Sequence, residues 1–214
     1  MKQMKKLAII GAGDLGRQLS ILAKQSNTVH PIGFYDDFTE VGKRVHSLPI
    51  MGQLSQISQD FKSNKFDVLV MGIGYSHFNF RKKTFEALSQ EIPFATLIHP
   101  SCVIDPSAKI GKGSVLFSGC LVSMGAEIKE NVLIYDGAII AHDSIIGNHS
   151  ILSPGVKISG FSYIGECVNL GTGTILIDNI NLTDFTRTGA GAVVVKSIEQ
   201  PGLYVGCPAK LHNA

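Results

Sequence analysis

An aliphatic residue recurs at every sixth position from Ile104 to Leu182 without one break in register. The same register reaches Thr188, where it weakens, and Val194, where it is restored. The unbroken set is Ile104, Ile110, Leu116, Val122, Ile128, Ile134, Ile140, Ile146, Leu152, Ile158, Ile164, Leu170, Leu176 and Leu182. Neither an α-helix nor an ordinary strand repeats with a period of six, so the pattern indicates a solenoid.

A second pattern accompanies the first, because a small or compact residue usually follows each aliphatic by four positions, as Ser114 follows Ile110. We interpret each hexapeptide as one short strand and one tight corner of a triangular coil, with the aliphatic pointing into the prism. Glycines such as Gly111 and Gly147 directly follow the aliphatic, and we expect them to tolerate the backbone geometry of the bend. An irregular β-sandwich is a poor alternative, since strands at intervals of about 8–12 residues would break the register.

The first hundred residues alternate β-runs and helical patterns, which predicts a small parallel, Rossmann-like sheet. A short KLAII strand runs into GAGDLGR and then into an apolar-periodic helix. Further strands are expected at IGFYDD, PIMG, DVLVMGIG and Ala95–Ile98, with helices at Gln53–Lys62 and Asn79–Glu91. The predicted boundary lies between a domain of residues 1–98 and one of residues 99–214.

The spacing G-x-G-x-x-G lets backbone amides approach a phosphate at a helix N-terminus. Because strand ends meet at one sheet edge, we expect a nucleotide-binding group there, made of Gly11, Gly13, Asp14, Asp36, Asp37 and Gly74. Structural alternatives stay open: Gly16 also fits close helix–strand packing, and both aspartates also fit a turn cap. Arg81 and Lys82 are either anion contacts or solvated helix charges.

Composition excludes several function classes. A formal charge of +2, with 17% charged residues and no long basic run, argues against nucleic-acid binding. The apolar stretches are far too short for a membrane span, and the basic N-terminus lacks the features of a signal peptide. The four cysteines lie at no metal-ligand spacing, so we expect no metal, reduced thiols and a cytoplasmic location.

Several segments together resemble the left-handed β-helix sugar acyltransferases: the strand ending in YDD, the junction IHPSCVIDPSAKIGKG, the central AHDSIIG, and the terminal GAGAVVVK and VGCPAK. The resemblance is strongest to the group that acetylates sialic acids or nucleotide-linked amino sugars from acetyl-CoA. It implies a homotrimer with each active site between adjacent prisms. It also implies that the N-terminal domain holds the nucleotide part of the acceptor.

Acyl transfer from a thioester requires a general base and a donor to the oxyanion. His142 is the candidate base, because its ordinary pKa near 6.5 suits proton transfer at neutral pH, and adjacent Asp143 is a candidate to orient it. Gly160 matches the glycine whose amide faces the thioester carbonyl in similar enzymes. It lies eighteen residues after His142, one full coil, so the period places both at one corner. His149 is interpreted as a corner histidine.

The C-terminal segment implies, by the same resemblance, a groove for CoA. The residues assigned to it, with Gly160, are Ala190, Lys196, Gly206, Pro208 and Lys210. Either lysine is a candidate phosphate contact, and ordinary solvated lysines are the alternative.

Two departures concern the acceptor. Related amino-sugar N-acetyltransferases commonly carry an asparagine where this chain has Tyr135, and often a second histidine where it has Ile151. Tyr135 and Asp136 are therefore candidate acceptor contacts. N-acetylation of a nucleotide-linked amino sugar is the leading hypothesis, with O-acetylation of sialic acid or another sugar as the alternative. A zinc hydratase on the same β-helix and a non-catalytic nucleotide-sugar sensor are the competing classes.

Overall fold

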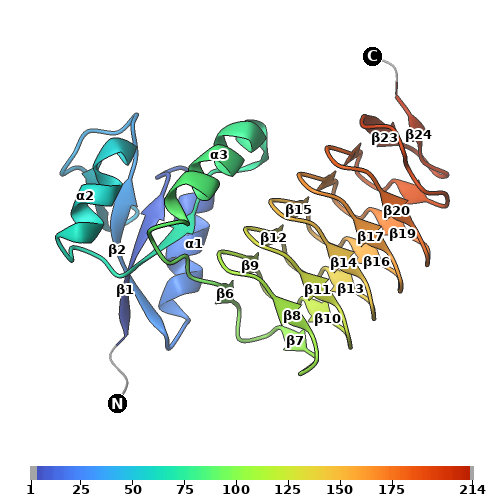
Figure 1. The fold of residues 1–214 in the computed structure, drawn as a ribbon, viewed down its shortest axis with the longest axis horizontal. Helices are drawn as coiled ribbons and strands as arrows, with labels where there is room; N and C mark the ends of the chain where they lie inside the picture. Colours follow the sequence, from blue (N-terminus) through green and yellow to red (C-terminus); the bar gives the residue numbers. More distant parts are fainter. Residues whose placement is uncertain (1–3, 213–214) are drawn as a thin grey trace. The chain divides into compact units, whose positions relative to one another are not determined.

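The computed structural model describes residues 4–212, which divide after Leu97 into two compact units. We describe each unit by itself (Figure 1). Within the described range, no helix combines the length and the apolar character that a membrane span requires.

The N-terminal unit is a five-stranded sheet in the order β3-β4-β2-β1-β5, parallel except for the β3–β4 hairpin. Its strands are β1 (Lys5–Ile10), β2 (Val29–Tyr35), β3 (Arg44–Val45), β4 (Leu48–Gly52) and β5 (Val68–Met71). Its helices are α1 (Asp14–Lys24), η1 (Leu54–Gln56), α2 (Ile57–Lys62), η2 (Tyr75–His77) and α3 (Phe78–Leu88). Strands β1 and β5 contain buried apolar runs, as expected of a parallel sheet covered on both faces.

The core of this unit explains the alternation of strands and helices. Ile57 of α2 and Phe85 of α3 join Ala8 and Ile10 of β1 in one buried cluster. On the other face of the sheet, α1 approaches so closely that a Cβ on Gly16 would overlap the carbonyl oxygen of Gly11. The close-packing alternative for Gly16 is thus the one that the structure supports.

Most predicted elements of this unit are present, and three differ. The Gln53–Lys62 segment begins as a 3₁₀ turn before α2, and the third helix runs from Phe78 to Leu88 instead of Asn79 to Glu91. The strand expected at Ala95–Ile98 is shorter than predicted, since only β6 (Leu97–Ile98) forms there. It belongs to an eight-stranded sheet of the β-helix. The alternation of strands and helices could not place so short a strand, because β6 pairs with β9 of the adjacent coil and is not part of the N-terminal sheet.

The C-terminal unit is a parallel β-helix with three sheets, whose coils stack as a ladder in Figure 1. One sheet contains β7 (Val103–Ile104), β10 (Leu121–Val122), β13 (Ile139–Ile140), β16 (Lys157–Ile158), β19 (Ile175–Leu176) and β22 (Val193–Val194). The second contains β8 (Lys109–Ile110), β11 (Glu127–Ile128), β14 (Ile145–Ile146), β17 (Tyr163–Ile164) and β20 (Asn181–Leu182). The third contains β6, β9 (Val115–Leu116), β12 (Leu133–Ile134), β15 (Ile151–Leu152), β18 (Asn169–Leu170), β21 (Arg187–Thr188), β23 (Leu203–Val205) and β24 (Lys210–Leu211).

The six-residue register is confirmed as the core of this helix. Strands eighteen residues apart pair in parallel, as Ile140 pairs with Val122 and Ile158. The aliphatics from Leu116 to Leu182 are all buried, and Thr188 is accommodated by a hydrogen bond to Thr174 of 2.7 Å. Burial of each of these aliphatic side chains contributes about 1.5–3 kcal/mol to the stability of the folded state.

The glycines that follow the aliphatics have a different role from the one expected. Gly111, Gly171 and Gly189 do not have positive φ, so the bend does not require them. A Cβ on Gly111 would lie 2.6 Å from the Lys129 backbone, and one on Gly171 would lie 2.6 Å from Thr188 O. These glycines therefore allow adjacent coils to approach each other. The left-handed corner conformation belongs to other positions, such as Gly137 with φ 67°.

Candidate active site

His142 and Asp143 form a pair at the corner between β13 and β14. The His142 Nδ1 lies 3.1 Å from Asp143 Oδ2, and the two side chains are 49% and 45% exposed. A carboxylate can only accept here, so the contact favours the tautomer with the proton on Nδ1. That tautomer leaves the Nε2 lone pair available to accept a proton. The geometry thus brings together the predicted base and its orienting group.

Gly160 lies one coil after His142, as the period predicts. The pairing of Ile140 with Ile158 sets this register. A Cβ built on Gly160 would lie 2.7 Å from both Cε1 and Nε2 of His142, so the imidazole rests directly against the glycine backbone. Among the described residues, the Gly160 N–H donates no hydrogen bond. The predicted oxyanion donor and the predicted base therefore adjoin each other at one corner.

Gly125 is a supporting residue that sequence reasoning missed. It precedes Asp143 by one coil, and a Cβ on it would overlap Asp143 Oδ1. The His142–Asp143 pair is thus accommodated by a glycine in each neighbouring coil, Gly125 on one side and Gly160 on the other. Counting eighteen residues back from Asp143 would have found it.

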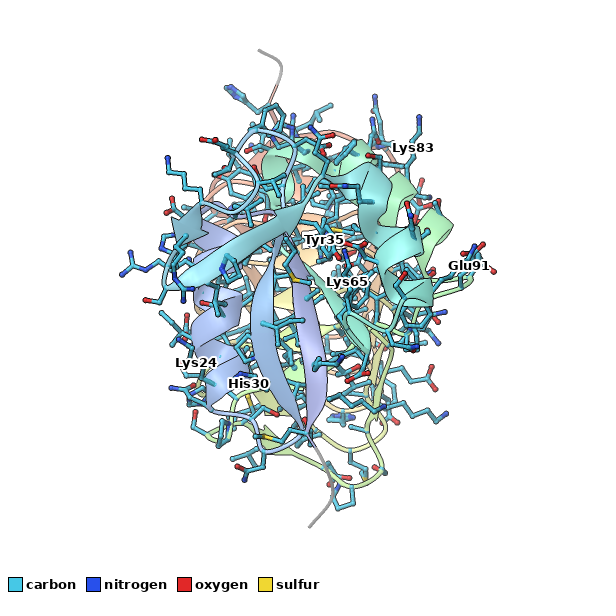
Figure 2. The ribbon with its side chains drawn as sticks, turned by 90° about the vertical axis from the view of Figure 1, so that its left-hand side faces the viewer. Lys24, His30, Tyr35, Lys65, Lys83 and Glu91 are labelled. Atoms are coloured by element: carbon cyan, nitrogen blue, oxygen red, sulfur yellow. The ribbon has the colours of Figure 1, made fainter. Side chains whose placement is uncertain are left out.

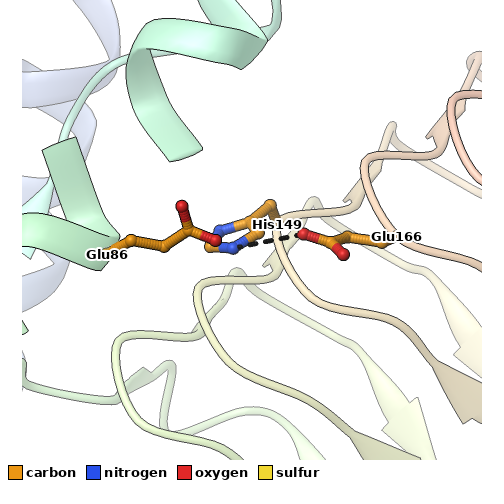
Figure 3. Close-up of side chains that lie close together, drawn as sticks. All are labelled: Glu86, His149 and Glu166. Atoms are coloured by element: carbon orange, nitrogen blue, oxygen red, sulfur yellow. Dashed lines mark ion pairs between the residues drawn. The ribbon is translucent and has the colours of Figure 1, made fainter. Parts of the chain in front are cut away.

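His149 occupies the next corner and differs from His142 in its burial. It is 3% exposed, and its Nδ1 accepts from the Asn131 amide at 2.9 Å. Figure 3 shows the Nε2 side of the ring directed at Glu166, 3.6 Å away. Because both ring nitrogens have partners, the expectation of a corner histidine agrees with this geometry.

Tyr135 and Asp136 lie at a different corner from His142, with β13 between the two. The Tyr135 ring stacks on Phe117, with centroids 5.1 Å apart and planes at 6°. Asp136 accepts a hydrogen bond from the Ser118 hydroxyl. One chain therefore does not bring these candidate acceptor contacts to its own His142. Phe117 and Ser118 carry no motif that would have identified them.

The candidate CoA residues lie toward the C-terminal end of the β-helix. The segment containing Gly206 and Pro208 adds to β22, since Val193 N–H donates to Gly206 O (3.0 Å) and Val193 O accepts from Ala209 N–H (2.7 Å). The remaining residues of this group, Ala190, Lys196 and Lys210, are exposed. Lys196 occupies the same position in its coil as His142 does in its own, three coils further along the chain.

A cavity of about 370 Å³ lies at the carboxyl ends of the strands in the N-terminal unit. Gly11, Asp36 and Asp37 line it as predicted, whereas Gly13, Asp14 and Gly74 are not among its lining residues. Its other walls were not predicted and are mainly apolar or aromatic: Phe38, Leu54, Ile73, His77 and Phe80. Parallel-sheet domains bind ligands at this edge. The sequence did not predict these lining residues because they come from separate loops.

Asp36 and Asp37 also accept hydrogen bonds from backbone N–H groups, so the alternative role of a turn cap applies to both. Asp36 accepts hydrogen bonds from the Ala12 N–H (2.9 Å) and the Phe38 N–H (3.0 Å). Burial acts to raise the Asp36 pKa, but these and other hydrogen bonds to the carboxylate together hold it below its ordinary value. Asp37 Oδ1 accepts from the Leu54 N–H at 2.8 Å. Asp36 thus shapes the cavity, and exposed Asp37 is the better candidate for contact with a ligand.

Arg81 is neither an anion contact nor a solvated charge. It is fully buried, and its Nη1 donates to Met71 O (3.1 Å) and Ile73 O (2.8 Å). The side chain therefore ties α3 to the end of β5 and holds the Ile73 wall of the cavity.

The chain contains a Rossmann-like unit followed in sequence by a hexapeptide β-helix that carries a hydrogen-bonded His–Asp pair. This combination is typical of acyltransferases. Family models match over residues 6–88, as the PglD N-terminal domain, and over residues 92–186, as the GMPPB C-terminal domain. A search of curated proteins finds no match.

Solved structures match over nearly the whole chain. The acetyltransferase domain of PglB from Neisseria gonorrhoeae is 31% identical, with a TM-score of 0.90 over 97% of this chain and 100% of that one. Its complex with acetyl coenzyme A is 30% identical, with a TM-score of 0.89 over 98% of this chain and 100% of that one. A mutant of perosamine N-acetyltransferase from Caulobacter crescentus, in complex with CoA and GDP-perosamine, is 25% identical, with a TM-score of 0.90 over 99% of each chain.

These matches confirm the predicted fold class, a Rossmann-like domain followed by a left-handed β-helix. The chain belongs to the hexapeptide-repeat sugar acetyltransferase family. Its membership sets aside the zinc hydratase and the non-catalytic sensor as competing classes, while the role of each site residue stays a prediction.

Proposed function

We propose that this enzyme transfers the acetyl group of acetyl-CoA to the amino group of a nucleotide-linked amino sugar, with His142 as general base. The observation that carries the proposal is the contact between the His142 ring and Gly160, with Asp143 on the opposite nitrogen. The relatives crystallised with acetyl-CoA, CoA and GDP-perosamine support the classes of donor and acceptor.

The reaction is a direct attack without a covalent enzyme intermediate. The acceptor nitrogen forms a bond to the thioester carbonyl carbon while His142 Nε2 takes its proton. The Gly160 N–H donates to the oxyanion of the tetrahedral intermediate, a contact that contributes about 10²–10³ in turnover. The C–S bond then breaks, and the proton held by His142 passes to the leaving thiolate of CoA.

The cavity of the N-terminal unit is our proposed site for the nucleotide. Phe38 is 99% exposed and Phe80 is 50% exposed at its rim, and aromatic faces of this kind stack on nucleobases. Asp37 supplies a carboxylate to accept a hydrogen bond from a base or ribose. CoA is assigned to the C-terminal group that includes Lys196 and Lys210.

We propose a homotrimer because one chain separates Tyr135 and Asp136 from His142 by the width of β13. A neighbouring copy can supply the Tyr135 corner to the His142 corner of the first. The outward face of the β13 sheet favours such a contact, since Val103 and Leu121 expose 64% and 39% of their surface there. Light scattering tests this assembly, and a monomer would contradict it. All four cysteines are free, in keeping with a cytoplasmic enzyme.

The test measures release of free CoA thiol with a panel of nucleotide-linked amino sugars and sialic acids. We expect turnover with an amino sugar, and His142→Ala should lower kcat by about 10²–10⁴ while CoA binding persists. Near-normal turnover of His142→Ala would refute the base assignment. Acetylation of a sialic acid hydroxyl alone would instead establish the O-acetyltransferase alternative.

A further inference from the structure

We infer that Phe161 is a positioning residue that holds the His142 imidazole in its reactive orientation. The inference rests on the proposed function, because it assumes that His142 is the base. It concerns a side chain that no motif distinguishes and that makes no contribution to the prism core.

The backbone of Phe161 gives the first observation. Its φ is 56°, in the left-handed region that disfavours bulky side chains. The equivalent corner positions in neighbouring coils carry residues that tolerate this conformation: Gly125 (φ 69°), Asp143 (φ 57°) and Asn179 (φ 58°). A phenylalanine in this column is therefore an exception that local backbone preference does not explain. Strain of this kind is concentrated at functional sites.

The surroundings of the Phe161 ring give the second observation. The ring is 57% exposed, so burial in a core does not account for it. It meets the His142 imidazole at a centroid distance of 4.9 Å and an interplanar angle of 87°, the edge-to-face geometry that aromatic pairs prefer. The Phe161 N–H also donates to His142 O at 3.1 Å.

The arrangement restrains the imidazole from three directions. Asp143 holds Nδ1, Gly160 lies against the Cε1–Nε2 edge, and Phe161 meets the ring at right angles. His142 is half exposed, so without Phe161 its ring could rotate about χ2 and swing Nε2 away from Gly160. Phe161 keeps the base aligned and contacts neither the proton nor the thioester.

Phe185 offers a matched control. It is also a phenylalanine, with a φ of 58° and 48% exposure. Its N–H donates to Glu166 O, nineteen residues back, at 2.9 Å, as the Phe161 N–H donates to His142 O. It lies at a different corner, and within residues 4–212 its ring meets no other aromatic ring. Phe161→Asn and Phe185→Asn should both raise the melting temperature, since asparagine tolerates a positive φ.

The kinetic experiment compares Phe161→Asn, Phe161→Tyr, Phe185→Asn and His142→Ala by thiol release. We expect Phe161→Asn to lower kcat about tenfold with KM for donor and acceptor nearly unchanged, because alignment is lost and binding is kept. Phe161→Tyr, which retains the ring contact, should restore most of kcat. Phe185→Asn should retain wild-type kcat.

The other results of these measurements would overturn either the inference or the proposed function. Wild-type kcat in Phe161→Asn, or an equal loss in Phe185→Asn, would overturn the inference while the strong defect of His142→Ala left the proposed function standing. Near-normal turnover of His142→Ala would overturn the proposed function itself, and the inference with it.

Discussion

Gly160→Ala provides a direct test of the contact between His142, the proposed base, and Gly160. The new Cβ would lie 2.7 Å from His142 Cε1 and Nε2, whereas ordinary van der Waals contact begins at 3.4 Å. The ring must therefore move by about 0.7 Å, because it is the flexible partner in the contact. The backbone itself accepts a side chain here, since Met124, His142 and Asp178 occupy the same corner position in other coils.

We expect this substitution to lower kcat without lowering the free energy of unfolding. A displacement near 1 Å costs about 10²-fold in a positioned reaction, so kcat should fall by about 10- to 100-fold. Stability should stay level or rise by about 0.4–1 kcal/mol, because alanine restricts the unfolded chain at an unstrained φ. Thiol-release kinetics and urea denaturation measure both quantities on the same preparation.

A double-mutant cycle assigns the effect to His142. In the His142→Ala background there is no ring to displace, so adding Gly160→Ala should change the residual rate by less than about twofold. The alanine keeps the backbone N–H, so the proposed oxyanion donor is retained. Unchanged kcat in the single mutant, or an undiminished loss in the double mutant, would refute the reasoning.

Three further predictions concern stability. Asn131→Ala should destabilise the β-helix by about 1–3 kcal/mol, because it removes the amide at 2.9 Å from buried His149; urea denaturation measures the loss, and no change would contradict a structural role. Tyr35→Phe should cost the N-terminal unit about 1–3 kcal/mol by removing the 2.8 Å hydrogen bond to buried Asp60, and hydrogen exchange of β2 reports it. The Asp36 pKa lies below its ordinary value of 3.8, so the stability that Asp36 contributes is complete above about pH 4 and is lost as the pH falls through the lowered pKa. Melting temperatures from about pH 6 to pH 2 should show this loss in the wild type, and an equal acid sensitivity in Asp36→Asn would exclude Asp36 as its source.

Tyr35 and Lys65, both labelled in Figure 2, are partners of the same carboxylate, Asp60. Tyr35 and Lys65 lie near each other there, and Asp60 accepts from the Tyr35 hydroxyl while pairing with the Lys65 ammonium at 2.8 Å. The alternation of β-runs and helices predicted the strand that carries Tyr35 and the helix that carries Asp60. It did not predict their contact, because the three positions share no sequence period.

The sequence by itself determined the β-helix and the stacking of His142 on Gly160. In a solenoid each coil contacts mainly its neighbours, so distance along the chain converts directly into position. Eighteen residues are one coil, and counting them places the His142 ring beside the Gly160 backbone. The same regularity places Gly125 beside Asp143.

Only the tertiary structure decided the rest. The cavity proposed for the nucleotide draws Phe38, Ile73 and His77 from separate loops of a sheet whose strand order differs from the chain order. The sequence left Arg81 open between an anion contact and a solvated helix charge, whereas the structure buries it, with Nη1 donating to carbonyls at and after the end of β5. The edge-to-face contact of Phe161 with His142 also depends on side-chain torsions that a repeat does not specify. Periodicity fixes where a backbone lies, whereas packing decides what each side chain meets.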